Sequence, residues 1–282
     1  MTPSRRPTRP VRVGPLTIGG GAPVSVQTMT KAPPDDIEAI LAQVREAADL
    51  GCDLIRLAVP NKRALAPFAE VKRRSPLPLV ADIHFNEELA LGAIRAGADK
   101  VRLNPGNMRD WDALAAVVEA AGTAGTALRI GVNSGSIRHH VKGDDPRAMA
   151  DALAEEILDY VERIEKIGFR NLVLSLKANN PAETIAANLA VARQTDCPLH
   201  LGVTAAGPEA EAMLKSAVGV GGLLAQGIGD TIRLSFTGPP AAEVLAARRL
   251  LRAVGLLRDR VEIVSCPTCG RCKVDLQQLV RE

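Results

Sequence analysis

The chain has 282 residues, of which 46% are hydrophobic and 24% charged, and its formal net charge is +3. This length supports one large core plus a small appendage, and the small net charge gives no general case for nucleic-acid binding. No apolar segment approaches the ~18 residues that span a bilayer, and the N-terminus lacks the apolar region of a signal peptide. The five cysteines therefore predict a reduced, cytoplasmic protein without disulfides or a membrane association.

The first residues form a basic, proline-rich segment that contains Arg5, Arg6, Arg9 and Arg12. A short run of like charges at a terminus is usually solvated. We interpret this segment as a solvated arm rather than as a binding tail.

Eight short apolar runs carry polar or charged residues at alternate positions, as strands with two different faces do. In the fourth run, for example, Val101 and Leu103 alternate with Arg102 and Asn104. One face of each strand is therefore predicted to pack on helices, and the other to converge on a cationic centre. The runs are Val24–Thr30, Leu54–Pro60, Leu79–Phe85, Lys100–Gly106, Leu128–Gly135, Leu172–Ala178, Leu199–Ala205 and Thr231–Gly238.

Stretches with helical spacing of apolar residues lie between these runs, and several end at a glycine. Strand and helix alternate about eight times, which predicts an α/β fold of the (β/α)8 TIM-barrel type. A doubly wound open sheet is the competing fold, but it would concentrate polar residues at one switch point instead of spreading them over all strands. The predicted helices are Ile37–Leu50, Glu87–Ala96, Trp111–Ala121, Pro146–Ile167, Ala182–Arg193 and Glu209–Val218.

The inward-facing charges predict an anion site, because the chemistry of such barrels lies at the C-terminal ends of the strands. Five cations face a single strand acid, Asp82, which leaves four of them unpaired; any one of them could instead form a structural ion pair. Guanidinium and ammonium groups suit phosphate oxygens, and neutral donors lie nearby, so the ligand is expected to be a diphosphate. The cations are Arg56, Arg102, Arg129, Lys177 and Arg233, and the neutral donors are Asn104, Asn107, Asn133, Thr204 and Ser235.

A cysteine cluster follows the barrel, with Cys266 and Cys269 in a C-x-x-C pair and Cys272 three residues later. Such a pair indicates a metal or cluster half-site, a redox disulfide or half of a zinc ribbon. Cys52 and Cys197 lie in barrel segments and are expected to be small core residues. The chain ends in the helix-like run Leu276–Glu282 with no second ligand group, which we interpret as C-terminal truncation.

Taken together, these residues resemble 4-hydroxy-3-methylbut-2-enyl diphosphate synthase, an enzyme family of the methylerythritol phosphate route to isoprenoids. The resemblance covers nearly the whole chain, and its motifs occur in the order typical of that family. The motifs are Val24–Thr30, Val80–Phe85, Val101–Asn107, Arg129–Ser136, Leu174–Ala178, Gly227–Arg233 and Cys266–Cys269.

The resemblance implies an iron–sulfur oxidoreductase of isoprene (terpenoid) biosynthesis that acts on CH or CH2 groups. Its substrate would be 2-C-methyl-D-erythritol 2,4-cyclodiphosphate, whose ring is opened and dehydrated with two electrons from flavodoxin or ferredoxin. A 4Fe–4S cluster with three Cys ligands and one Glu would lie in a small C-terminal domain. In the family's homodimer, the cluster of one subunit caps the barrel of the other.

Matching positions give specific roles to residues of this chain. Asp82 and His84 would lie beside the substrate hydroxyls, and Cys266 and Cys269 would be two of the cluster ligands. Cys272 falls where the family has no ligand. The diphosphate ligands would be Arg56, Arg102, Asn104, Arg129, Asn133, Lys177, Thr204, Arg233 and Ser235.

Two departures from the family pattern qualify this assignment. The later Cys and Glu ligands of the cluster have no counterpart within residues 1–282, so this chain alone is expected to be inactive. The family has Thr-Glu-Ala-Gly where this chain has Thr204-Ala205-Ala206-Gly207, and the exchange removes a candidate acid–base group.

The predicted domains are a substrate-binding barrel over residues 1–257 and the beginning of an iron–sulfur domain over residues 258–282. Two alternatives remain open. One is a pteroate-synthase-like phosphate-binding barrel without a cluster, and the other is a non-catalytic diphosphate-binding protein.

Overall fold

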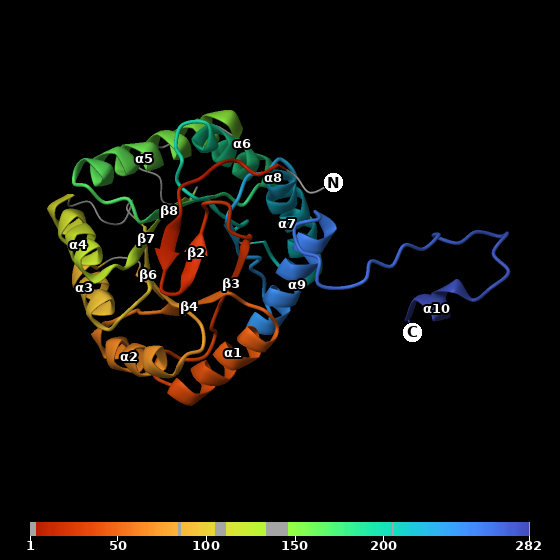
Figure 1. Cartoon of the computed structure of the whole chain (residues 1–282), viewed down its shortest axis with the longest axis horizontal. Coiled ribbons are helices and arrows are strands. Elements are labelled where there is room, and N and C mark those ends of the chain that lie inside the picture. Colours follow the sequence, from red (N-terminus) through yellow and green to blue (C-terminus); the bar gives the residue numbers. More distant parts are fainter. Residues whose placement is uncertain (1–3, 84–85, 105–110, 134–145, 205, 282) are drawn as a thin grey trace.

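A closed barrel of eight parallel strands forms the centre of the molecule in the computed structural model, which describes residues 4–83, 86–104, 111–133, 146–204 and 206–281. Figure 1 shows a ring of helices around this barrel. The barrel strands are β3 (Ser25–Met29), β4 (Leu54–Ala58), β5 (Leu79–Asp82), β6 (Lys100–Leu103), β7 (Ala127–Asn133), β8 (Leu172–Lys177), β9 (His200–Leu201) and β10 (Thr231–Ile232).

The strand order follows the chain from β3 to β8, and β10 joins β3 to β9. A parallel bridge between Leu174 and Leu199 closes the ring between β8 and the segment that leads into β9. This closure confirms the predicted barrel, and the open doubly wound sheet was the wrong alternative. Strands β9 and β10 are shorter than the apolar runs that predicted them, because their C-terminal halves leave regular pairing as they approach the barrel mouth.

The predicted helices are present, but three of the described helices had not been predicted. They are α2, a basic helix that buries only Phe68 and Val71, the four-residue α8, and α9, which begins at Pro240. The helices are α1 (Ile37–Asp49), α2 (Leu65–Arg74), α3 (Glu87–Arg95), α4 (Trp111–Ala124), α5 (Pro146–Lys166), α6 (Pro181–Ala192), α7 (Glu209–Ser216), α8 (Gly222–Ala225), α9 (Pro240–Ala253) and α10 (Leu276–Arg281).

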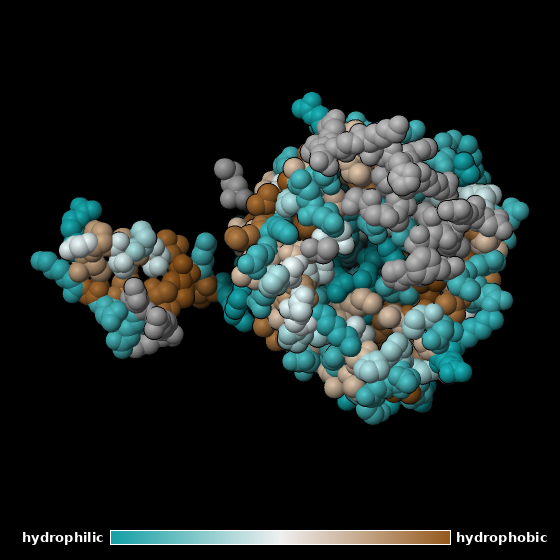
Figure 2. All heavy atoms as spheres, turned by 180° about the vertical axis from the view of Figure 1, so that it is seen from behind, coloured by the Kyte–Doolittle hydropathy of each residue, from teal (hydrophilic) through white to brown (hydrophobic). Residues whose placement is uncertain are grey.

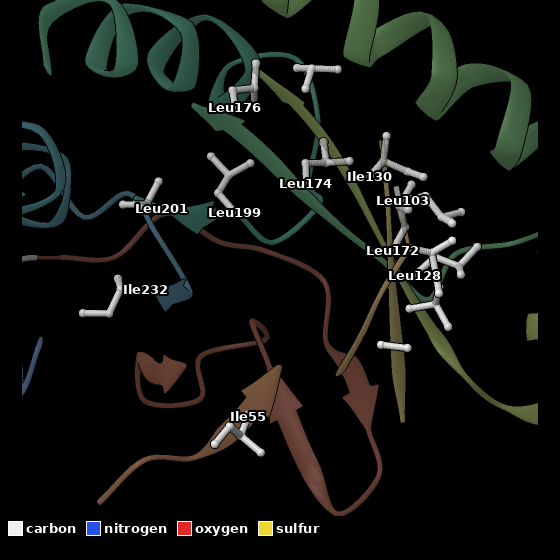
Figure 3. Close-up of a cluster of buried hydrophobic side chains, with 14 of the residues drawn as sticks. Ile55, Leu103, Leu128, Ile130, Leu172, Leu174, Leu176, Leu199, Leu201 and Ile232 are labelled. Carbon is white, nitrogen blue, oxygen red and sulfur yellow. The ribbon is translucent and has the colours of Figure 1, made fainter. Parts of the chain in front are cut away.

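The main hydrophobic core lies between the strands and the surrounding helices. Figure 3 shows part of it, with aliphatic side chains such as Ile130, Leu174 and Leu201 projecting from β7, β8 and β9. These residues alternate along the strands with the inward polar residues, as the period of two requires. Cys52 and Cys197 are also buried, as predicted for small core residues.

The N-terminal segment is bound to the barrel, so its interpretation as a solvated arm was wrong. Arg5 pairs with Asp230 at 2.8 Å, and Arg6 donates to the carbonyl of Cys197 at 2.6 Å. A hairpin of β1 (Val11–Val13) and β2 (Leu16–Ile18) follows and crosses the barrel end in Figure 1. Its apolar side chains pack on those of β4, β5, β7 and β8, so the hairpin plugs the end opposite the predicted site.

The segment after α9 extends away from the barrel (Figure 1). Residues 258–275 contain no regular helix or strand, and the segment ends in the short helix α10. No helix of the described residues is both long and apolar enough to cross a membrane.

Candidate functional site

A cavity of about 190 Å³ lies at the C-terminal ends of the barrel strands. Figure 2 shows this end as a hollow with hydrophilic residues at its centre. We call its wall the cationic cage, since five of its residues are cations. The cage consists of Arg56, Asp82, Arg102, Arg129, Gly131, Val132, Asn133, Ser175, Lys177, Val203, Thr204, Arg233 and Ser235.

The structure therefore brings together nine of the predicted site residues, including all five cations and Asp82. Asn104 is buried just after β6 and is not part of the cavity wall. His84, Asn107 and Ala205 lie outside the described residues. Gly131 and Ser175 lie within the predicted strand runs Leu128–Gly135 and Leu172–Ala178 but were not predicted as site residues.

One inward-facing glycine, Gly202, leaves room for a long cation. A Cβ on Gly202 would stand 2.7 Å from Nζ of Lys177 and 2.8 Å from the backbone oxygen of Arg233, and the backbone contact excludes a side chain there. A Cβ on Gly131 would make an ordinary van der Waals contact with Nε of Arg102 at 3.6 Å. Gly202, which directly follows β9, thus allows Lys177 of β8 to reach across the barrel.

Asp82 lies between two guanidinium groups at the end of β5. Its carboxylate is 3.8 Å from Nε of Arg56 and 3.6 Å from Nη1 of Arg102. Burial, with repulsion from neighbouring Arg233 and Arg102, lowers the pKa of Arg56 to about 10 against the opposing effect of Asp82. One carboxylate is therefore shared by two cations and does not fully compensate either.

Glu243 of α9 is the main site residue that sequence reasoning missed. It is 1% exposed and accepts from Nε and Nη2 of Arg233 at 3.1 and 3.3 Å. It also accepts from Thr28 at 2.8 Å and pairs with Lys31 at 3.0 Å. The prediction that four cations lack a partner was wrong for Arg233, because the count considered strand residues only.

Met29, at the end of β3, joins the two sides of the cage. Its sulfur accepts from Nε of Arg56 at 3.1 Å and from Nη1 of Arg233 at 3.7 Å. A thioether is a weak acceptor without charge. Met29 thus orients both guanidinium groups and leaves their charge available.

Arg129 and Lys177 form no ion pair with any described acid. Arg129 is 1% exposed, and its Nε and Nη1 have no partner among the described residues. Burial lowers the pKa of Arg129 and of Lys177 well below the ordinary values, and repulsion from nearby cations adds to this effect. Buried charges without partners are costly, and a bound polyvalent anion would compensate the charge of both residues.

A further polar layer lies deeper in the barrel, between the cage and the hairpin. Lys100 and His200 are fully buried, and neither Nζ of Lys100 nor the ring nitrogens of His200 have a partner among the described residues. Burial, with Arg129 as the main charged neighbour, lowers the pKa of both well below its usual range. Both residues fall within the predicted strand runs, but no local pattern distinguished them from core residues.

The three C-terminal cysteines are exposed. Thr268 adopts a left-handed φ of 67° between Cys266 and Cys269, and the amide of Cys272 donates to the carbonyl of Cys269 at 2.9 Å. Hydrogen bonds from Arg271 lower the pKa of the Cys269 thiol, which favours the thiolate that binds metals. The described residues nevertheless bring no three potential His, Cys, Asp or Glu ligands together.

Fold and cavity together define a TIM-type (β/α)8 barrel with a cation-lined cavity at its catalytic end. Residues 8–248 match the family model described as the GcpE TIM-barrel domain. The chain is 44% identical to a protein of Caldanaerobacter subterraneus, with 100% of this chain and 79% of that protein aligned. It is also 44% identical to a protein of Aquifex aeolicus, with 99% and 78% aligned.

Both proteins are named 4-hydroxy-3-methylbut-2-en-1-yl diphosphate synthase (flavodoxin). The chain belongs to this family, the GcpE family, as its motifs predicted. It spans 79% of the length of the first of these relatives.

Solved structures with the same fold include dihydropteroate synthases of Coxiella burnetii and Yersinia pestis. The TM-scores are 0.63 and 0.62, with 13% and 14% identity. Each comparison covers 87% of this chain and 97% of the other. At this identity the likeness concerns the fold alone, and it gives no support to the pteroate-synthase alternative.

Proposed function

We propose that the chain is the substrate-binding barrel of an enzyme that converts 2-C-methyl-D-erythritol 2,4-cyclodiphosphate to 4-hydroxy-3-methylbut-2-enyl diphosphate. The cationic cage carries this proposal, because among the described residues five cations face two carboxylates, Asp82 and Glu243, in a site of about 190 Å³. Charge-assisted bonds from Arg and Lys match the oxygens of a diphosphate. Family membership supports the same substrate class.

The barrel residues would bind and orient the substrate. Arg129 and Lys177 would donate to the diphosphate, and so would Arg56 and Arg233, which are both held against the sulfur of Met29. Asp82 would accept from a substrate hydroxyl, since its carboxylate lines the cavity. His84 and Asn104 remain predicted contacts. The reaction takes up two electrons and a proton, breaks a ring C–O bond and releases a hydroxyl as water.

The electrons call for a redox group, and the family implies a 4Fe–4S cluster with Cys266 and Cys269 as ligands. The described residues supply no complete ligand set near these cysteines, so they do not by themselves fit the cluster. The names of the relatives support flavodoxin as the electron donor. A cytoplasmic homodimer completes the proposal.

The proposal is tested by calorimetric titration of residues 1–282 with the cyclodiphosphate. Each charge-assisted hydrogen bond contributes roughly 1.5–3 kcal/mol, so Arg233→Ala should weaken binding about tenfold or more, and Arg129→Ala likewise. Lys166→Ala is the matched control, since this cation is 68% exposed on α5. Unchanged affinity in the Arg129→Ala/Arg233→Ala variant would contradict the proposed site.

A further inference from the structure

A second cavity, of about 620 Å³, opens beside the cationic cage, and we call it the apolar groove. It lies between the end of β4 and the start of α3. Val59 and Leu89 are its most buried apolar residues, at 1% and 7% exposure. Its volume is typical of a small-molecule site. The lining residues are Met29, Ala58, Val59, Pro60, Asn61, Lys62, Asp82, Asn86 and Leu89.

The apolar groove and the cationic cage share a wall. Asp82 lines both cavities. Met29 lines the groove and holds its sulfur against Arg56 and Arg233, which line the cage. A ligand whose anionic head is bound in the cage can therefore continue across Met29 into the groove.

Protein partners already occupy several polar groups of the groove. The side-chain oxygen of Asn86 accepts from the amide of Leu89 at 3.1 Å, and that of Asn61 accepts from the amide of Arg63 at 3.0 Å. The ammonium group of Lys62 pairs with Glu88 at 2.5 Å. Recognition in the groove is therefore mainly apolar, which differs from the needs of the hydroxyl-rich proposed substrate.

We propose that the cage and the groove together form a binding site for linear prenyl diphosphates, with the diphosphate in the cage and the branched hydrocarbon chain in the groove. This inference rests on the proposed function of the cage. Such esters would compete with the cyclodiphosphate and bind more tightly as the chain lengthens. The groove thus gives the barrel an affinity for products of later prenyl-chain elongation reactions.

The test is a chain-length series on wild-type residues 1–282, with methyl, dimethylallyl and geranyl diphosphate as titrants. One fully buried methylene strengthens binding about fourfold. We expect each step of the series, which adds first four and then five carbons, to strengthen binding about tenfold or more, and inorganic pyrophosphate to displace all three esters. If geranyl and methyl diphosphate bind equally, or if pyrophosphate does not displace geranyl diphosphate, the inference is wrong.

Two variants locate the chain in the groove. Val59→Thr keeps the side-chain shape but replaces a methyl group with a hydroxyl, and Leu89→Ala removes apolar surface. Each variant should weaken the binding of geranyl diphosphate about fivefold and leave the binding of methyl diphosphate unchanged. Leu214→Ala is the control, because Leu214 is 71% exposed on α7, outside the groove lining. The wild-type series decides the question even if a variant fails to fold.

The outcome separates this inference from the proposed function. If methyl diphosphate and the cyclodiphosphate both fail to bind, the function proposed for the cage is wrong. If both bind and chain length has no effect, only the role of the groove is wrong.

Discussion

The barrel and the C-terminal segment both present groups that suit a ligand, but they hold these groups differently. The cage cations are held inside a barrel whose strands are paired on both sides, and Arg129 is 1% exposed. Cys266, Cys269 and Cys272 are exposed on residues 258–275, which have no regular secondary structure. A preorganised site binds at a smaller cost for ordering its groups. The cage should therefore bind the proposed anion with little rearrangement, whereas the cysteines would have to be ordered before they could bind a metal.

The same contrast appears in the apolar residues. Among the described residues, the barrel exposes four large hydrophobic side chains, whereas the much shorter C-terminal segment exposes six. The barrel buries its hydrophobic residues and holds its uncompensated charges in the cage, as functional sites commonly do. The C-terminal segment instead exposes both its apolar and its charged residues to solvent. Binding should therefore depend on the barrel alone.

The largest expected effect tests that dependence directly. Arg129→Met/Lys177→Met should weaken pyrophosphate binding by about 100-fold or more, because two charge-assisted contacts of roughly 1.5–3 kcal/mol each are lost. Calorimetric titration measures the loss. Cys266→Ser/Cys269→Ser is the control and should bind like the wild type. The cage variant should also melt a few degrees higher, since it removes two cations that form no ion pair with any described acid, one of them the buried Arg129; lower stability would show that these cations support the fold.

The next prediction concerns Glu243, the buried acid that pairs with Arg233 of the cage. Glu243→Gln should destabilise the barrel by about 3 kcal/mol, because Arg233 and Lys31 lose their buried counter-charge. Binding of pyrophosphate should weaken about tenfold, since Arg233 is no longer held by two hydrogen bonds. Urea unfolding and calorimetry measure the two effects. Glu162→Gln on exposed α5 serves as the control, and equal stability of Glu243→Gln and wild type would contradict the assigned network.

The sequence predicted the barrel because period-two alternation recurs in every strand, and it predicted the cage because each inward cation falls near a strand end. It could not predict Glu243, since a carboxylate on an amphipathic helix has no distinguishing local pattern. Glu243 reaches Arg233 only because α9 packs against β3 and β10 closes beside it. Such a contact depends on how the helix packs against the barrel, which no local pattern encodes.

The N-terminal hairpin was missed for a related reason. Its two strands, Val11–Val13 and Leu16–Ile18, have three residues each. Strands of this length are too short for a periodicity signal. The neighbouring arginines suggested solvation, whereas Arg5 and Arg6 bind to Asp230 and Cys197, which lie on loops more than 180 residues away. The fold, not the local sequence, decides whether such charges are solvated.

The pH dependence of binding offers a smaller but specific test of the cage. Burial and the adjacent Arg129 hold the pKa of Lys177 well below that of a free lysine, and a bound diphosphate should raise it. Between those two pKa values the free lysine is neutral and the bound lysine is charged, so binding takes up a proton; below both values it does not. As the pH rises through that window, affinity for the diphosphate should fall by up to about tenfold per pH unit.

Calorimetry at pH 8 in buffers with different ionisation enthalpies measures this uptake. The ligand's own titration contributes equally to wild type and Lys177→Met, so the difference between them belongs to Lys177. Equal uptake in both proteins would show that Lys177 is already charged in the free barrel.

Iron binding tests the other side of the comparison. After anaerobic reconstitution, residues 1–282 should retain well below stoichiometric iron and sulfide, because metal-site folding energy requires the full ligand set and the described residues offer no three-ligand group. A chelator should leave the melting temperature of the barrel unchanged. Stoichiometric iron that is lost in Cys272→Ser would show instead that this cysteine completes the site.

The smallest expected effect concerns the boundary between the two regions, proposed at residue 257. Limited trypsin digestion should cut first at Arg258, Arg260, Arg271 and Lys273, which lie on the exposed segment. Asp259 links this segment to α9 through Arg248 and Arg252, at 2.5 and 2.6 Å. Exposed ion pairs of this kind contribute about 0–1 kcal/mol each. Residues 1–257 should therefore melt within a few degrees of residues 1–282 and bind pyrophosphate equally well, whereas a large loss of either property would mean that the segment is part of the barrel's folding unit.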